Sequence, residues 1–160
     1  MSKIYILMGV SGCGKSTIGE RLSKKIDLPF IDADDFHSKE NKIKMSEGIP
    51  LTDVDRKPWL TSVNLKLKEL QLKGAILACS ALKESYRELL SANIKNINWV
   101  YLQGDYDIIE KRLKRRASHF FNPDLLQSQF DCLEEPSYGV RISIVLNPDR
   151  ILDYIINKNE

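Results

Sequence analysis

The segment Gly9-Val-Ser-Gly-Cys-Gly-Lys-Ser16 constrains the fold of this chain more than any other. It matches the pattern GxxxxGK[ST], and it stands between an apolar run, residues 4–8, and a stretch of helical periodicity, residues 15–26. Glycines let the backbone curl until successive N–H groups point inward, and the positive end of the following helix faces the same point. The segment therefore predicts a phosphate-binding loop between a buried strand and a helix.

In such a loop Lys15 can reach the β- and γ-phosphates of a nucleotide, and Ser16 can hold Mg²⁺. ATP is the expected ligand, and the residues expected to bind it are Gly9, Val10, Ser11, Gly12, Cys13, Gly14, Lys15, Ser16 and Thr17. The alternative is a glycine-rich turn without a ligand, but the paired Lys-Ser argues against it. Cys13 is either an oxidation-sensitive thiol near a helix start or simply a small residue that the loop tolerates.

Short apolar runs alternate with longer helical segments along the rest of the chain. We expect further strands over residues 29–31, 75–79, 99–102 and 142–146, and helices over 38–47, 58–73, 83–92, 105–116, around 125–130 and from 148 onward. Such alternation predicts an α/β fold, in which helices cover both faces of a parallel sheet. No linker rich in Pro, Gly or Ser divides the chain, so we expect one domain over residues 1–160.

The composition is that of an ordinary globular protein, with 42% hydrophobic and 29% charged residues. The formal net charge of +2 gives no electrostatic reason to expect a nucleic-acid partner. No apolar run is long enough to span a bilayer and no secretory signal is visible, so we expect a cytoplasmic protein without a membrane partner. The three cysteines are far apart in the sequence, which disfavours both a zinc site and a disulfide framework.

A cluster of acids follows the second predicted strand, in the segment Asp32-Ala-Asp-Asp-Phe-His37. Ligands of parallel sheets gather at the carboxyl ends of the strands, which places these carboxylates at the mouth of the nucleotide site. Asp34 could there orient an attacking hydroxyl group. The alternative is a set of solvated loop residues or helix caps, and that alternative is stronger for Asp35. A guanine-binding Asn-Lys-x-Asp signature is missing, which disfavours a GTPase.

Two further segments are more specific than the loop, namely Asp55-Arg-Lys-Pro-Trp-Leu60 and Cys79-Ser-Ala-Leu-Lys83. Together with the loop and the acidic segment they resemble the gluconokinases, within the shikimate kinase and nucleoside monophosphate kinase-like group. The resemblance extends from residue 4 to about residue 136. Ser38 and Ser118 depart from it, because the family often has Pro and Gly at these positions.

The resemblance implies a three-layer P-loop kinase fold with a five-stranded parallel sheet and a mobile lid at about residues 112–135. It implies ATP- and Mg²⁺-dependent phosphorylation of D-gluconate at its 6-hydroxyl, which gives 6-phosphogluconate and ADP. It also implies a homodimer. Alternatives are a kinase for another small acceptor, such as shikimate or a nucleoside monophosphate, and an ATP-binding regulator without transfer activity.

Gluconate is a linear polyol with a carboxylate, so its site needs cations at one end and hydroxyl partners along the chain. Arg56, Lys83 and Arg87 are the candidate cations, and Asp34 and His37 suit the hydroxyl groups. Arg56 could instead form a salt bridge at a helix start, and His37 could be a structural histidine.

The basic end of the helix over residues 105–116 has two interpretations as well. By resemblance, Arg112 would lie against adenine, and Arg116 would close on the phosphates as a catalytic residue beside Lys15 and Asp34. His119, with its aromatic neighbours, would anchor the lid. The alternative is a solvated basic face near a helix C-terminus, where the helix dipole favours cations.

Overall fold

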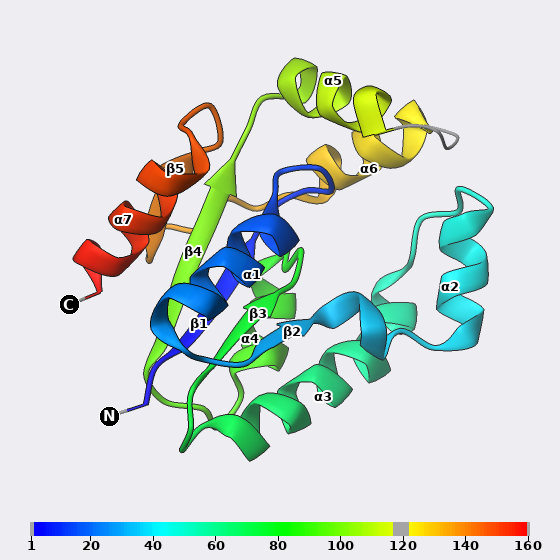
Figure 1. Ribbon diagram of the computed structural model, residues 1–160. Coiled ribbons are helices and arrows are strands. Elements are labelled where there is room, and N and C mark those ends of the chain that lie inside the picture. The colour runs from blue at the N-terminus through cyan, green and yellow to red at the C-terminus, as the bar shows by residue number, and fades with distance from the viewer. Residues whose placement is uncertain (1, 117–121, 160) are drawn as a thin grey trace.

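The computed structural model describes residues 2–116 and 122–159 of the chain (Figure 1). Its centre is a five-stranded sheet in the order β2-β3-β1-β4-β5, and every neighbouring pair is parallel. The strands are β1 (Ile4–Met8), β2 (Phe30–Asp32), β3 (Ala75–Ala78), β4 (Ile97–Gln103) and β5 (Val140–Ser143). The expected five-stranded parallel sheet is therefore confirmed.

Helices connect the strands, and some of them cover the two faces of the sheet. They are α1 (Lys15–Ile26), the 3₁₀ helix η1 (Ala33–Phe36), α2 (Lys39–Ser46), α3 (Asp53–Leu70), α4 (Glu84–Ser91), α5 (Tyr106–Arg116), α6 (Pro123–Cys132) and α7 (Pro148–Lys158). Figure 1 shows α5 and α6 side by side beyond the carboxyl end of β4, on the side of the molecule where the β1–α1 loop lies.

The side chains of β1 show how the layers form, because successive residues of a strand face opposite sides of a sheet. Tyr5 and Leu7 belong to a core shared with α1 and α7, whereas Ile4, Ile6 and Met8 belong to a core shared with α3 and α4. All five residues are buried. A strand with two apolar faces can lie only between two helical layers, which explains the uninterrupted apolar run in the sequence.

The start of α3 differs from the sequence-based expectation. The helix begins at Asp53 rather than at Pro58, which lies inside it. Thr52 and Asp55 form a capping box, in which the Thr52 hydroxyl accepts a hydrogen bond from the Asp55 amide and the Asp55 carboxylate accepts one from the Thr52 amide. This reciprocal capping satisfies two backbone donors and sets the helix start about one and a half turns before the proline.

Strand boundaries near the edges of the sheet also differ from expectation. β4 is longer than the predicted 99–102, and β5 covers Val140–Ser143 rather than 142–146. After β5 the chain turns, with the Leu146 amide 3.4 Å from the Ser143 carbonyl, and Asn147 then caps α7 through the Arg150 amide. At an edge strand only one neighbour fixes the register, so apolar residues alone did not define the end of β5.

Candidate active site

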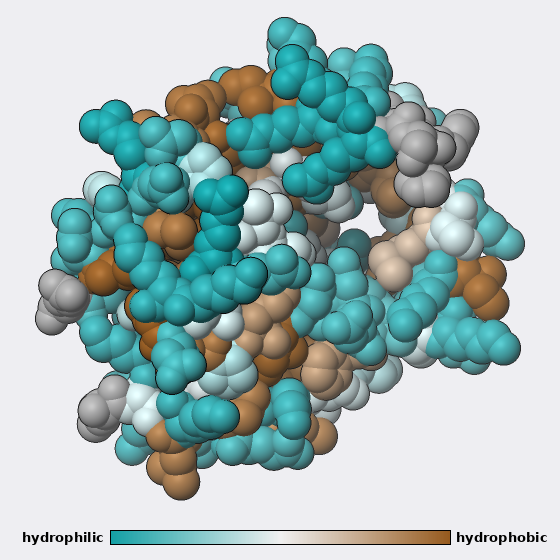
Figure 2. All heavy atoms as spheres, viewed as in Figure 1, coloured by the Kyte–Doolittle hydropathy of each residue, from teal (hydrophilic) through white to brown (hydrophobic). Residues whose placement is uncertain are grey.

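A cavity of about 400 Å³ opens at the carboxyl ends of β2 and β3 and beside the loop that follows β1. It is visible in Figure 2 as a hollow between the surface formed by α5 and α6 and the surface formed by α2. The predicted site residues that line it are Ser11, Gly12, Gly14, Lys15, Ser16, Thr17, Asp34, His37, Arg56 and Arg116. Segments more than 100 residues apart in the sequence therefore meet at one edge of the sheet, as parallel topology requires.

The loop between β1 and α1 has the backbone geometry that its glycines allow. Gly14 has φ 98° directly before α1, and Gly9 has φ 146°, both in the region that L side chains rarely adopt. A Cβ atom at Gly9 would come within 2.7 Å of the Leu102 carbonyl oxygen. The loop is thus folded tightly against β4, and its following helix directs its N-terminus at the cavity.

Lys15 folds back over the loop from the first position of α1. Its Nζ atom donates hydrogen bonds to the carbonyl oxygens of Gly9, at 2.9 Å, and Val10, at 3.0 Å. The Cys13 sulfur lies 3.8 Å from the same nitrogen, on a side chain that is buried. Gly9, Val10 and Cys13 therefore form the wall behind Lys15 rather than the surface of the cavity, and burial of Cys13 favours its interpretation as a small packing residue.

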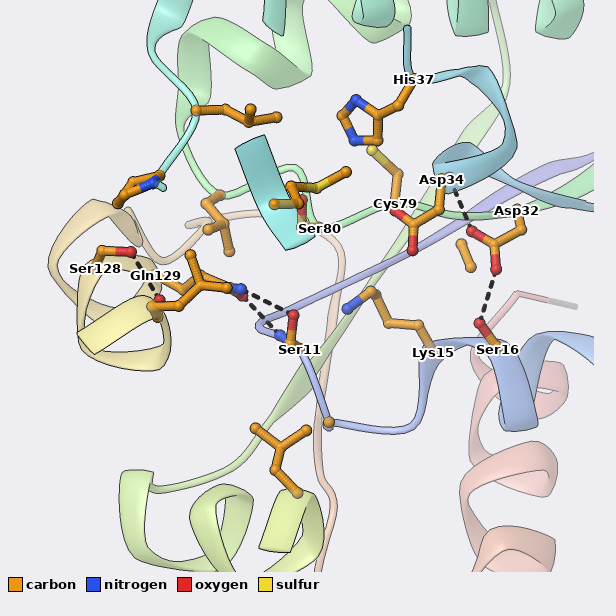
Figure 3. A pocket seen from close by; sticks show the side chains of 18 of the residues that line it. Ser11, Lys15, Ser16, Asp32, Asp34, His37, Cys79, Ser80, Ser128 and Gln129 are labelled. Atoms are coloured by element: carbon orange, nitrogen blue, oxygen red, sulfur yellow. Dashed lines mark hydrogen bonds between the residues drawn. The ribbon is translucent and has the colours of Figure 1, made fainter. Parts of the chain in front are cut away.

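Ser16 and Asp32 bring two oxygen ligands together at the cavity. The Ser16 hydroxyl lies 3.1 Å from Oδ2 of Asp32, and the Asp34 amide donates to Oδ1 of the same carboxylate at 2.9 Å (Figure 3). A hydroxyl and a carboxylate are hard oxygen ligands, which suit Mg²⁺. Within the described part of the chain no three His, Cys, Asp or Glu residues cluster as a metal cage. This donor set fits an ion that takes most of its ligands from phosphates and water.

Asp34 lies in η1, two residues beyond the end of β2, and its carboxylate lines the cavity. Burial raises the pKa of Asp34 above its usual value, and the nearby carboxylate of Asp32 raises it further, while Lys15 acts in the opposite direction. Figure 3 shows the side chains of Asp34 and Lys15 projecting into the same space. A carboxylate in this position can accept a hydrogen bond from a hydroxyl group that enters the cavity.

Arg56 and His37 line the part of the cavity next to α3. The guanidinium of Arg56 donates to the Leu51 carbonyl at 2.5 Å and to the Tyr86 hydroxyl at 3.0 Å, and it lies 5.2 Å from the centre of the Tyr86 ring. The His37 ring stacks on Trp59 with 4.0 Å between ring centroids. Both polar groups are therefore held in place before any ligand enters.

Lys83 and Arg87, two of the three cations expected to bind a carboxylate, are not among the residues that line the cavity. The ammonium group of Lys83 lies 3.3 Å from Asp53 Oδ1. Arg87 is only 1% exposed, and its guanidinium donates to the carbonyls of Ala81, at 2.7 Å, and Glu134, at 2.8 Å. The geometry gives Arg87 a structural role, because it ties α4 to the segment that follows α6.

The predicted lid, at about residues 112–135, contains the end of α5 and all of α6. Its residues 117–121, which include Ser118 and His119, lie outside the described residues. Arg116 lines the cavity at the end of α5. Arg112 does not line the cavity, and its guanidinium donates to the Ile144 carbonyl at 2.7 Å.

Ser38, one of the two departures from the family pattern, caps α2 by accepting a hydrogen bond from the Asn41 amide at 3.1 Å. The substitution of a common proline thus leaves the helix start intact.

Comparison with known proteins agrees with this geometry. The sequence profile of the shikimate kinase family matches residues 11–138. A probable gluconokinase of Dictyostelium discoideum is 44% identical and aligns over 96% of this chain and 84% of its own. The thermoresistant gluconokinase of Escherichia coli (strain K12) is 41% identical over 96% of this chain and 89% of its own. The chain belongs to the gluconokinase family, within the shikimate kinase-like group.

A crystal structure of a gluconokinase from Sinorhizobium meliloti 1021 has the same fold, with a TM-score of 0.88 and 36% identity over 98% of this chain and 91% of that one. Both the family and the P-loop kinase fold expected from the sequence are therefore confirmed. Within the described ranges, no helix has the length and apolar character that crossing a membrane requires.

Three polar residues that line this gluconokinase-family cavity are not predicted as site residues from the sequence, namely Ser80, Ser128 and Gln129. Ser80 follows β3 as closely as Asp34 follows β2, so the rule that ligands gather at the carboxyl ends of strands could have identified it. Gln129 lies on α6, and its side-chain amide accepts from the Ser11 amide at 2.7 Å and donates to the Ser11 hydroxyl at 2.8 Å. No local sequence signal indicates this contact across 118 residues.

Proposed function

We propose that this protein transfers the γ-phosphoryl group of ATP to the 6-hydroxyl of D-gluconate, giving 6-phospho-D-gluconate and ADP. The observation that carries the proposal is the convergence in one cavity of Lys15 from the phosphate-binding loop, Asp34 from the end of β2 and Arg56 from α3. These groups suit the phosphates, the attacking hydroxyl and the carboxylate, respectively. The gluconokinase names of relatives that cover nearly the whole chain support this choice of substrate.

On the nucleotide side, the amides of the loop and the N-terminus of α1 bind the phosphates. Lys15 exchanges its hydrogen bonds with the Gly9 and Val10 carbonyls for phosphate oxygens. Ser16 would hold Mg²⁺, with Asp32 next to it, and this ion would neutralise charge on the β- and γ-phosphates. Arg112, which lies beside the loop, is proposed to pack near the base, and Arg116 to contact the transferring group.

On the acceptor side, Asp34 orients the 6-hydroxyl toward the terminal phosphorus. Little charge develops on the attacking oxygen early in a loose phosphoryl-transfer transition state, so alignment matters more than strong basicity. Arg56 is the cation of the three candidates that reaches the cavity, and its fixed guanidinium suits two hydrogen bonds to the gluconate carboxylate. His37 then faces the chain of hydroxyl groups between these ends.

Two alternatives receive less support. A kinase for shikimate or a nucleoside monophosphate is disfavoured by the gluconokinase relatives, and a regulator without transfer activity is disfavoured by the presence of Lys15, Ser16 and Asp34 in one cavity. We also propose, from kinship alone, that the protein is a cytoplasmic homodimer. The segment of about residues 112–135, with the end of α5 and all of α6, would form a closing lid that keeps water from the transferring group.

A coupled assay of ADP release with gluconate, shikimate and nucleoside monophosphates as acceptors tests the proposed function. We expect ADP release with gluconate and a product heavier by one phosphoryl group in the mass spectrum. Activity with shikimate or a nucleotide, without activity on gluconate, would assign another acceptor. ATP binding without any phosphorylated product would support the regulator.

A further inference from the structure

Hydrogen bonds behind His37 determine which of its ring nitrogens carries the proton. The side-chain nitrogen of Asn41 lies 2.9 Å from the backbone carbonyl oxygen of Asp55. A carbonyl can only accept, so the amide nitrogen of Asn41, and not its oxygen, faces that carbonyl. The same nitrogen lies 3.4 Å from Nδ1 of His37. Its second N–H is therefore available to Nδ1, which makes Nδ1 an acceptor and leaves the proton on Nε2.

Packing prevents the ring from turning over. His37 and Trp59 are stacked with an interplanar angle of 19°, and both are buried. Trp59 is itself fixed, because its indole N–H donates to the Ala33 carbonyl at 2.7 Å. A ring turned by half a rotation would stay stacked but lose the Asn41 contact. The amide of Asn41 thus selects one orientation of the stacked ring.

The ring is also neutral. Burial, together with the positive charges of Arg56 and Lys42, lowers the pKa of His37 from 6.5 to about 4. A neutral imidazole has one donor and one acceptor nitrogen, so a ring whose Nδ1 accepts must donate from Nε2. His37 cannot then serve as a general base through Nε2, which agrees with the role proposed for Asp34.

Nε2 is open to the cavity. Among residues 2–116 and 122–159, none forms a hydrogen bond with Nε2. Every buried side-chain nitrogen or oxygen of these residues has a partner, so Nε2, which has none, is not buried. His37 lines the cavity, and Figure 3 shows its ring reaching toward the space where Asp34 and Cys79 lie. The free N–H group therefore points at the space that a substrate would fill.

We propose that Asn41 is a positioning residue that holds His37 as the Nε2–H tautomer, so that His37 donates one hydrogen bond to an acceptor oxygen of the bound sugar acid. This inference rests on the proposed function of the same cavity. It assigns Asn41 a role in substrate recognition although Asn41 is not among the residues that line the cavity. The Nε2–H donor of His37 would therefore require a substrate oxygen with a free lone pair at the position that Nε2 faces.

The tautomer is tested directly by ¹⁵N NMR of the two histidine rings at neutral pH, without substrate. We expect an unprotonated Nδ1 and a protonated Nε2 for His37, identified by the signals that His37→Gln removes. If that variant does not fold, His119→Gln leaves only the His37 signals. Protonation at Nδ1, or a mixture of tautomers, overturns the proposal.

A matched pair of substitutions tests the donor. Glutamine places its side-chain nitrogen near the position of Nε2, whereas asparagine places it near Nδ1. We expect His37→Gln to keep the KM for gluconate within about threefold of the wild type, and His37→Asn to raise it by about tenfold, with the KM for ATP unchanged in both. Equal losses in the two variants would contradict a donor at Nε2.

Substitution of Asn41 tests the positioning. In Asn41→Asp the side chain can only accept, so it attracts the proton to Nδ1 and leaves Nε2 as an acceptor. We expect the tautomer to reverse in the spectrum and the KM for gluconate to rise by about tenfold, whereas kcat changes less. A reversed tautomer with an unchanged KM would overturn the role in recognition. If the wild type does not phosphorylate gluconate, the proposed function fails, but the ring spectrum still decides the tautomer.

Discussion

The Ser16 hydroxyl lies 3.1 Å from Oδ2 of Asp32, so the first turn of α1 and the end of β2 are joined at the floor of the cavity. The other carboxylate oxygen is held by the amide of Asp34 at 2.9 Å. The Ser16 hydroxyl and the Asp32 carboxylate are therefore both held in fixed orientations. Preformed oxygen ligands reduce the cost of ordering them when a metal ion binds, which favours the proposed Mg²⁺ site.

Removal of the Ser16 hydroxyl should weaken metal binding specifically. We expect Ser16→Ala to raise the Mg²⁺ concentration for half-maximal turnover by about tenfold to a hundredfold. Initial rates measured against Mg²⁺ at saturating ATP and gluconate test this. Ser62→Ala, on the exposed side of α3, is the matched control. A Mg²⁺ requirement equal to that of the control would remove Ser16 from the metal site.

Loss of the Lys15 ammonium should nearly abolish turnover, because Lys15 is the cation that the phosphate-binding loop brings to the cavity. We expect Lys15→Ala to lower kcat by about a hundredfold to a thousandfold. Lys66→Ala, which removes an exposed lysine paired with Glu69, serves as the control. Gluconate phosphorylation at a comparable rate by Lys15→Ala would refute the assignment of Lys15.

Asp34→Asn should separate alignment from nucleotide binding. The amide keeps the size of the side chain. Its nitrogen, unlike the carboxylate oxygen that it replaces, cannot accept a hydrogen bond from the 6-hydroxyl of gluconate. We expect kcat to fall by at least about tenfold while the Kd for ATP, measured by calorimetry, stays within about twofold. Unchanged kcat would remove Asp34 from the mechanism.

The same substitution should stabilise the fold at neutral pH. Burial and the Asp32 carboxylate raise the pKa of Asp34 above 3.8, so the folded protein binds this proton more tightly than the unfolded chain does. The stability that this group contributes is present below pH 3.8 and is lost as the pH rises through the folded pKa. Thermal melting at neutral pH should therefore give a higher Tm for Asp34→Asn than for the wild type.

Replacement of Arg87 should unfold the protein rather than impair gluconate binding. Arg87→Met leaves the Ala81 and Glu134 carbonyls without their buried donor, and we expect a loss of about 3–5 kcal/mol in the free energy of unfolding. Urea titration measures it, with the half-exposed Arg21→Met as the control. A stable Arg87→Met protein with a raised KM for gluconate would instead restore Arg87 as a substrate-binding residue.

The pH dependence of stability should reveal the buried His37. Its pKa is about 4 in the folded protein, against 6.5 for a free histidine side chain, so the unfolded chain binds this proton more tightly. Its contribution is complete above pH 6.5 and is lost as the pH falls toward 4, at no more than about 1.4 kcal/mol for each pH unit. Urea titrations between about pH 4.5 and about pH 7 should show a smaller slope for His37→Gln than for the wild type. Equal slopes would show that His37 is solvated.

The sequence predicts the parts of this fold that are set locally. The buried run of β1, the glycines of the loop and the start of α7 at Pro148 each depend on a few neighbouring residues, and the structure has these elements where they are expected. The predicted start of α3 was wrong because Pro58 is a strong but misleading helix signal, whereas the capping box at Thr52 used Asp55 in place of the more usual Glu.

The site was harder to predict where tertiary packing decides. The sequence offers Lys83, Arg87 and Arg56 alike as cations for a carboxylate, but only Arg56 lines the cavity. Lys83 forms an ion pair with Asp53, and Arg87 donates to buried backbone carbonyls. The charge of a residue is visible in the sequence, but its partners are not. The contact between Gln129 and the loop depends in the same way on how α6 is placed over the sheet.

That contact makes nucleotide binding an exchange rather than an addition. Gln129 already satisfies the Ser11 amide, as backbone carbonyls already satisfy Lys15. An incoming triphosphate must compete with these internal groups, so its affinity measures the difference between two sets of polar contacts. Because internal groups already form these hydrogen bonds, the enthalpy of ATP binding should be small. Anions that bind more weakly than a triphosphate should fail to displace Gln129 and the backbone carbonyls.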